Sequence, residues 1–284
     1  MSSDLTPAPP RQLEEGSPEF FNEPPHFSHP RIPEDIRVPW GWLDLLLFVG
    51  QSVFASIIIG ILVLVVLLLC GVKISAIEQP GRGQGVFAVV AQVIIDIEWL
   101  AFLALWIRLR YEEPFWGTIG WRKLDPGIVP RWVAYGGLVV TGAVISFLVD
   151  AASNLSPPKG NLPIDAIYQD KLSALLFLLM AVLLAPLVEE TIFRGFIYPA
   201  IAKSWGIGVS ILLTGALFGF LHGFQLSFSW WQTALLVIVG IIFTWVRAGT
   251  KTVAASYCLH VGYNSFLFAG FLVSTHFLKV MPPH

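Results

Sequence analysis

Long apolar runs separated by short polar connections predict helices that cross a membrane. Several runs approach or exceed the roughly 18 apolar residues that mark a spanning helix. Alternating ten-residue patterns typical of β-barrel strands are absent from the sequence. The sequence therefore predicts an all-α fold, a polytopic transmembrane helical bundle, with spans at about residues 42–72, 86–107, 132–149, 172–202, 209–224, 230–246 and 253–271.

The fourth run leaves the number of spans at seven or eight. From Leu172 to about Ala202 it is longer than a bilayer core, at about 1.5 Å per residue. It must therefore tilt, kink at Pro186 or contain a separate short helix.

Composition supports an integral membrane protein. Apolar residues make up 55% of the chain and charged residues 13%, and the mean hydropathy is +0.72, far from the soluble average. The formal net charge of −2 gives no electrostatic case for a nucleic-acid partner. Membrane lipids and membrane-associated proteins are the expected partners.

The chain divides into four parts. Residues 1–40 hold nine of the twenty prolines and seven acidic residues, which predicts a disordered polar tail. Residues 41–165 form the N-terminal transmembrane helices, residues 166–275 form the core with the candidate chemistry, and residues 276–284 form a short C-terminal tail. Trp40 and Trp42 are expected to anchor the first helix at the interface.

Basic residues in the connections favour a cytoplasmic N-terminus, because cytoplasmic loops carry an excess of Lys and Arg. With that orientation the cytoplasmic side holds Arg31, Arg37, Arg108, Arg110, Arg122, Lys123, Arg131, Lys203, Arg247 and Lys251, and the other side holds Lys73, Arg82, Lys159, Lys171 and Lys279.

Two adjacent glutamates in the fourth span are the strongest functional signal. A charge near the middle of a bilayer costs about 2.5–3.5 kcal/mol even on the mildest insertion scale. Glu190 and Arg194 are four residues apart on one helix face, which predicts a structural ion pair. Glu189 is rotated by roughly 100° from Glu190 and is expected to face a polar cavity as a general base. The alternative that both acids only tie helices together through Arg194 stays open.

Two later spans supply possible partners for Glu189. His222 follows Phe218 by one helical turn, and His260 shares a helix face with Asn264. Neutral imidazoles and a carboxylate fit a zinc ligand set of Glu189, His222 and His260. They would serve equally to hold a water without a metal. Zn²⁺ is therefore a candidate cofactor, with metal-independent water activation as the alternative.

Depth along the helices suggests that these groups meet. Glu189, His222 and His260 all lie at similar depth, roughly 13–19 Å from the cytoplasmic surface at about 1.5 Å per residue. Peptide hydrolysis at that depth needs a water-filled cavity, which we expect to open toward the cytoplasmic side.

The three motifs together resemble the CPBP (CAAX protease and bacteriocin-processing, or Abi) family of intramembrane proteases. They are Glu-Glu-x-x-x-Arg at 189–194, Phe-x-x-x-His at 218–222 and His-x-x-x-Asn at 260–264, and the resemblance covers roughly residues 170–270. It implies that Glu189 activates the water and that His222, His260 and Asn264 complete the catalytic set. Glu190 and Arg194 would have a structural role.

The resemblance implies a CAAX-type intramembrane endopeptidase, with metal use undecided. Its expected substrate is a peptide bond near the C-terminus of a prenylated or other membrane-associated protein. The alternative is a non-enzymatic membrane protein, a transporter or an immunity or assembly factor, in which the same polar cluster moves an ion or locks helices.

Overall fold

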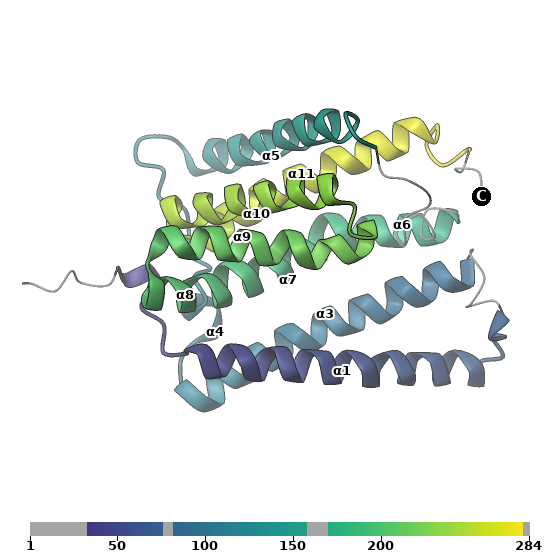
Figure 1. Ribbon diagram of the computed structural model, residues 1–284, viewed down its shortest axis with the longest axis horizontal. Helices are drawn as coiled ribbons and strands as arrows, with labels where there is room; N and C mark the ends of the chain where they lie inside the picture. Colours follow the sequence, from purple (N-terminus) through teal and green to yellow (C-terminus); the bar gives the residue numbers. More distant parts are fainter. Residues whose placement is uncertain (1–32, 76–81, 158–169, 281–284) are drawn as a thin grey trace, which may run out of the picture. The chain divides into compact units, whose positions relative to one another are not determined.

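A computed structural model describes residues 33–75, 82–157 and 170–280, all within one unit, Pro33–His284 (Figure 1). Helices account for most of the described chain. They are η1 (Glu34–Ile36), α1 (Trp42–Leu69), α3 (Arg82–Tyr111), α4 (Phe115–Thr118), α5 (Arg131–Ser153), α6 (Lys171–Leu179), η3 (Met180–Leu184), α7 (Ala185–Glu190), η4 (Thr191–Ile197), α8 (Tyr198–Trp205), α9 (Ile207–Gly223), η5 (Phe224–Leu226), α10 (Trp230–Thr250) and α11 (Val253–Ser274).

The predicted polytopic helical bundle is confirmed. In the described part of the chain, six helical stretches are long and apolar enough to cross a membrane. They comprise α1, most of α3, α5, the stretch from α6 to α8, α9 with η5, and α10. α11 contains 22 residues and falls on the seventh predicted segment. The protein is therefore an integral membrane protein.

The fourth predicted span is one helical stretch of 35 residues, Lys171–Trp205. No separate short helix interrupts it, because α6, η3, α7, η4 and α8 follow one another without a break. Asp170 caps its first turn by accepting a hydrogen bond from the Ser173 N–H. The stretch ends at Gly206, whose φ of +84° suits glycine and reverses the chain into α9.

Glycines bring two pairs of helices into close contact. α5 packs on α11, where a Cβ at Gly142 or Gly262 would overlap a backbone carbonyl of the partner helix. α9 packs on α10, where a Cβ at Gly219 would overlap Val237. Small residues at helix–helix contacts typically let membrane spans approach closely in this way. It also fixes α9, α10 and α11, which carry most of the candidate chemistry.

Residues 33–40, predicted to belong to the disordered tail, are instead packed against the helices. Ile36 and Val38 are buried, and Trp40 is fully buried. Trp40 donates from Nε1 to the carbonyl of Phe196 at 2.9 Å, so it is not the interfacial anchor that the sequence suggested. Residues 1–32, the rest of the predicted tail, lie outside the described residues.

Candidate active site

The adjacent glutamates lie at the end of α7, between the two π-helical segments η3 and η4. In a π-helix each N–H bonds to the carbonyl five residues earlier, and such segments are frequent at functional sites. The Ala185 N–H bonds to the carbonyl of Met180 in this register. The next carbonyl, that of Ala181, would need a donor from Pro186, which has no N–H. The missing N–H of Pro186 therefore leaves the Ala181 carbonyl free for another partner.

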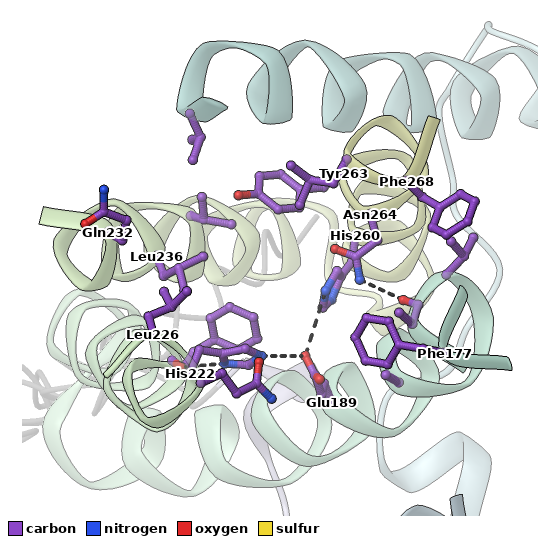
Figure 2. A pocket seen from close by; sticks show the side chains of 18 of the residues that line it. Phe177, Glu189, His222, Leu226, Gln232, Leu236, His260, Tyr263, Asn264 and Phe268 are labelled. Atoms are coloured by element: carbon purple, nitrogen blue, oxygen red, sulfur yellow. Dashed lines mark hydrogen bonds and ion pairs between the residues drawn. The ribbon is translucent and has the colours of Figure 1, made fainter. Parts of the chain in front are cut away.

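Asn264 on α11 is that partner. Its Nδ2 donates to the Ala181 carbonyl at 2.7 Å (Figure 2). An amide nitrogen carries two hydrogens, so one is used here and the second remains for a group in the cavity that Asn264 lines. Pro186 in one span thus leaves free the carbonyl that holds the Asn264 amide of another span.

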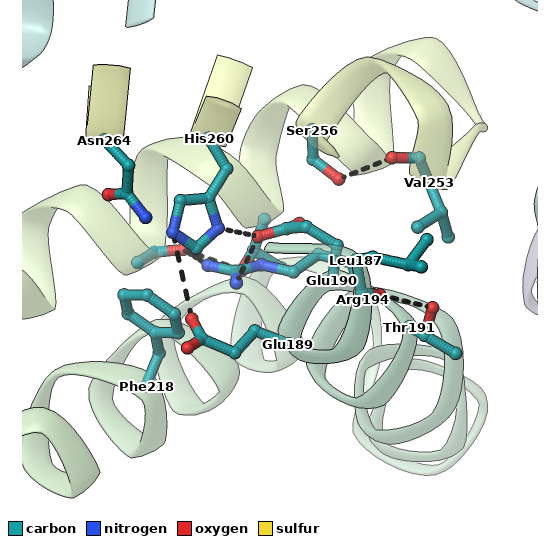
Figure 3. A network of polar contacts seen from close by, with 12 residues as sticks. Leu187, Glu189, Glu190, Thr191, Arg194, Phe218, Val253, Ser256, His260 and Asn264 are labelled. Carbon is teal, nitrogen blue, oxygen red and sulfur yellow. Dashed lines mark hydrogen bonds and ion pairs between the residues drawn. The ribbon is translucent and has the colours of Figure 1, made fainter. Parts of the chain in front are cut away.

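Glu190 and Arg194 form the ion pair that their spacing predicts (Figure 3). Both side chains are fully buried, and Arg194 Nη1 lies 2.9 Å from Glu190 Oε1. The other guanidinium nitrogens are also bonded, Nη2 to the carbonyl of Gly240 at 2.9 Å and Nε to the hydroxyl of Thr244 at 3.3 Å. The guanidinium carbon lies 4.6 Å from the centre of the Phe218 ring. Each guanidinium nitrogen thus has a partner, which offsets part of the cost of burying the charges, whereas Glu190 Oε2 is buried with no hydrogen-bond partner among the described residues.

The same carboxylate also holds His260. Glu190 Oε1 lies 2.9 Å from His260 Nδ1, and His260 is almost completely buried. An ionised carboxylate can only accept hydrogen bonds, so Nδ1 carries the hydrogen. In the neutral ring this leaves the lone pair on Nε2, which points toward Glu189 (Figure 3).

His222, in the last turn of α9, is held in the same tautomer. Its Nδ1 lies 2.8 Å from the carbonyl of Phe218, one turn earlier, and a carbonyl also only accepts. The imidazole packs on the Phe218 ring with 4.3 Å between ring centres. The Phe-x-x-x-His motif therefore fixes the ring by both a hydrogen bond and a ring contact, and Nε2 is again left facing Glu189.

Three acceptor atoms converge at Glu189. Its Oε2 lies 3.6 Å from Nε2 of His222 and 3.8 Å from Nε2 of His260, and this buried oxygen has no hydrogen-bond partner among the described residues. When both rings are neutral, lone pairs face one another, which requires a donor or a cation between them. Polar contacts beyond about 3.5 Å are commonly bridged by water. The geometry is therefore suited to holding a water whose hydrogens point at these groups.

The zinc hypothesis involves the same three side chains. The described residues contain no group of three His, Cys, Asp or Glu side chains arranged to hold a metal ion. Zinc thus stays a prediction, and the chemistry below is derived from the protein's own groups.

These groups line a cavity of about 450 Å³ between α3, α5, the α6–α7 region and α9 to α11. Most of the wall is apolar, and Glu189, His222, His260 and Asn264 all face it (Figure 2). A cavity with apolar walls and a few convergent polar groups is typical of a ligand or substrate site. The structure therefore brings together all four residues predicted to be catalytic.

Three further acids in or at the end of the predicted spans, Asp96, Glu98 and Asp150, differ in their positions. Asp150 lines the cavity near the end of α5. Asp96 is buried and accepts a hydrogen bond at 2.8 Å from Gln92, which lines the cavity. Glu98 instead accepts from Gln51 of α1 and ties that helix to α3. Only Glu98 therefore has the purely packing role.

Sequence reasoning missed several residues of this site. Gln92 and Gln232 line the cavity and could have been noticed as polar residues inside or at the edge of apolar runs. The Gly240 carbonyl and the Ala181 carbonyl carry no such signal, because backbone groups look alike in every sequence. Their roles depend on which helices become neighbours.

The cavity reaches one end of the bundle. Its wall includes Ser153 at the end of α5, Gln225 after α9 and Gln232 at the start of α10. The cytoplasmic side predicted from the basic residues includes the opposite ends of α9 and α10, next to Lys203 and Lys251 (Figure 1). The end of the bundle that the cavity reaches is therefore opposite to the end where these basic residues lie.

Fold and site together define a polytopic membrane protein with a glutamate–histidine centre inside its helical bundle. Residues 171–266 match the family model described as type II CAAX prenyl endopeptidase Rce1-like. This segment, about a third of the chain, contains all three motifs, and the match confirms the resemblance to the CAAX protease family seen in the sequence. The family is one of membrane proteases, which favours the enzyme over the non-enzymatic alternative. No curated protein and no solved structure matches the chain.

Proposed function

We propose that this protein is an intramembrane endopeptidase in which Glu189 activates a water for attack on a peptide bond of a membrane-associated protein. The observation that carries the proposal is the convergence of Glu189 Oε2 with the Nε2 atoms of His222 and His260 at one point of an accessible cavity. A water at that point can donate one hydrogen to the carboxylate and one to an imidazole.

The reaction follows from these positions. Glu189 takes a proton from the water as its oxygen attacks the carbonyl carbon of the peptide bond. The second hydrogen of Asn264 Nδ2 is the donor for the oxygen of the resulting tetrahedral intermediate, in the manner of an oxyanion hole. Glu189 then returns the proton to the leaving nitrogen as the carbon–nitrogen bond breaks, which gives a carboxylic acid and an amine; the proton of the acid then passes to the amine or to water. Glu190 and Arg194 do not contact the reacting groups in this mechanism. Glu190 acts through His260, because its hydrogen bond fixes the tautomer of that ring.

The expected substrate is a segment near the C-terminus of a prenylated or other membrane-associated protein. The family match supports a membrane-associated substrate, and the apolar wall of the cavity suits an apolar side chain or chain. We include a prenylated and an unmodified peptide in the test because the cavity's composition is compatible with both.

Replacing the carboxylate tests the mechanism. Detergent-purified wild type and Glu189→Gln would be assayed on peptides with and without a prenylated C-terminal cysteine. We expect Glu189→Gln to lower the cleavage rate by about 10²–10⁴-fold or more, the usual contribution of a general base, with an unchanged unfolding temperature. Glu98→Gln is the matched control, because it removes another intramembrane carboxylate that lies outside the cavity.

The alternatives give different results. Full activity of Glu189→Gln would contradict the assignment of the base. Each protein would also be assayed after chelation and after zinc is restored. Activity that is lost and regained in this arm would favour the zinc hypothesis, and activity that persists after chelation would favour the metal-independent one.

A further inference from the structure

The direction in which the catalytic cavity opens can be read from the helix ends that form its wall. Every cavity residue of α9 and η5 lies at or beyond Phe218, and every cavity residue of α10 lies at or before Phe243. On α5 the wall is formed by Val149, Asp150 and Ser153, in the last turn. The cavity thus extends from the catalytic groups at mid-bundle to the end at which α5 and α9 finish and α10 begins. We call this end the mouth.

The opposite end of the bundle is closed above the glutamates by the connection between α4 and α5. Trp121 Nε1 donates to the Thr191 hydroxyl at 2.9 Å, one residue after Glu190. Ile119 is buried against Gly195, where an added Cβ would lie 2.8 Å from the Ile119 carbonyl. The approach from this side to η4 is therefore filled by tightly packed chain.

Further bonds fix that connection and the segment before α1. The Val253 N–H donates to the Gly120 carbonyl at 2.9 Å, and the Thr252 hydroxyl donates to the Arg122 carbonyl at 2.6 Å. Arg247, almost fully buried, pairs with Asp35 at 3.2 Å. These bonds join α10 and the start of α11 to two segments outside the long helices, so the closed end is held by specific contacts of the fold.

Basic residues are concentrated at the closed end. Arg108, Arg110, Arg122, Lys123, Arg131, Lys203, Arg247 and Lys251 lie there, at the ends of α3, α8 and α10 and in the connection before α5. At the mouth end the described chain has Lys73, Arg82, Lys171 and Lys279. Since an excess of Lys and Arg marks cytoplasmic ends, the closed end is assigned to the cytoplasm.

We infer that the catalytic cavity opens to the non-cytoplasmic side of the membrane, and that its substrate is a segment of an exported or membrane-anchored protein exposed on that side. The statement about the substrate rests on the proposed function. The side to which the cavity opens rests only on the packing of the helices and the distribution of basic residues. Of the two substrate types proposed above, this side selects a membrane-associated protein exposed on the non-cytoplasmic side, because a tail that stays in the cytoplasm, such as that of a prenylated protein, would face the closed end.

Single reporter cysteines test the side of access without requiring cleavage. In full-length protein with Cys70→Ser and Cys258→Ser, four variants would each carry one new cysteine. Gln225→Cys reports on the mouth, Leu236→Cys on the cavity wall and Lys123→Cys on the exposed chain of the closed end. Leu217→Cys is the matched control, since Leu217 is an exposed apolar residue of α9 that does not line the cavity.

A small cationic, membrane-impermeant thiol reagent would be added to intact cells and to inverted membrane vesicles. We expect Gln225→Cys and Leu236→Cys to be modified in intact cells and protected in inverted vesicles. Lys123→Cys should show the reverse pattern, and Leu217→Cys should be modified in neither because it faces lipid.

Three outcomes would overturn the inference. Modification of Leu236→Cys from the side of Lys123→Cys would place the opening at the basic end. Modification of Gln225→Cys from the cytoplasm would reverse the orientation, and a Leu236→Cys that reacts from neither side would mean that no opening exists. None of these readouts depends on proteolysis, so they are separable from a failure of the proposed function.

Discussion

At the scale of single residues, the two adjacent glutamates act differently because each has different neighbours. Glu190 is fully buried and is held by Arg194 and His260. Glu189 is about a quarter exposed, and its Oε2 faces imidazole nitrogens at more than 3.5 Å. The helix geometry alone predicted that the two side chains point apart. That Glu190 also orients His260 was not predictable, because His260 lies 70 residues away in the chain.

The buried ion pair predicts a large loss of stability when one partner is removed. Arg194→Met leaves Glu190 buried without its cation and should lower the free energy of unfolding by about 3–5 kcal/mol. The double variant Arg194→Met/Glu190→Gln removes both charges and should be less destabilised than Arg194→Met alone. Thermal unfolding of the purified protein in detergent measures both. A double variant that is less stable than the single variant would show that the unpaired charge is not the main cause of the stability loss in Arg194→Met.

At the scale of the helical elements, the site depends on an irregular helix. For the long fourth span the sequence left a tilt, a kink at Pro186 or a separate short helix open, and the structure has π-helical segments on both sides of α7. These segments change the direction in which side chains emerge, so the regular spacing used on the sequence is only approximate there. The bond from Asn264 to the carbonyl of Ala181 is a direct result of the missing proline N–H.

This bond predicts an energetic coupling between Asn264 and Pro186. In wild type, Asn264→Ala leaves the buried carbonyl of Ala181 unsatisfied and should cost about 1–3 kcal/mol. In a Pro186→Ala background the new N–H can bond to that carbonyl, so Asn264→Ala should cost less. A double-mutant cycle on unfolding free energies measures the coupling. Equal losses of unfolding free energy in the two backgrounds would contradict the idea that the missing proline N–H frees the carbonyl for Asn264.

At the scale of the whole molecule, segments outside the spans close one end of the bundle. Residues 33–40, which composition suggested were disordered, contain the fully buried Trp40 and the partner of Arg247. Lys203 donates to the carbonyls of Val38 and Trp40 as well. A proline-rich, charged segment can thus be ordered when its few apolar residues and one acid meet matching groups on the helices.

Removal of Asp35 at this end should loosen residues 33–40 without altering the candidate catalytic groups. Asp35→Asn leaves Arg247, which is 1% exposed, without its counter-charge. It should lower the free energy of unfolding by at most about 3–5 kcal/mol. Residues 33–41 should become more sensitive to limited proteolysis. Asp125→Asn, which removes an exposed acid of the nearby connection, should leave proteolysis unchanged. Equal sensitivity of the two variants would mean that the ion pair does not hold the segment.

The sequence by itself determined the class of the protein, the positions of its spans and the identity of the candidate catalytic residues. It could do so because apolar length and intramembrane charge are local properties, and because the three motifs each lie within one helix. Tertiary structure alone decided that Glu190 holds His260, that Asn264 bonds to a freed carbonyl, and that the cavity reaches the end of the bundle opposite the basic residues. These features arise from contacts between distant helices and from backbone atoms, whose positions depend on how the spans pack.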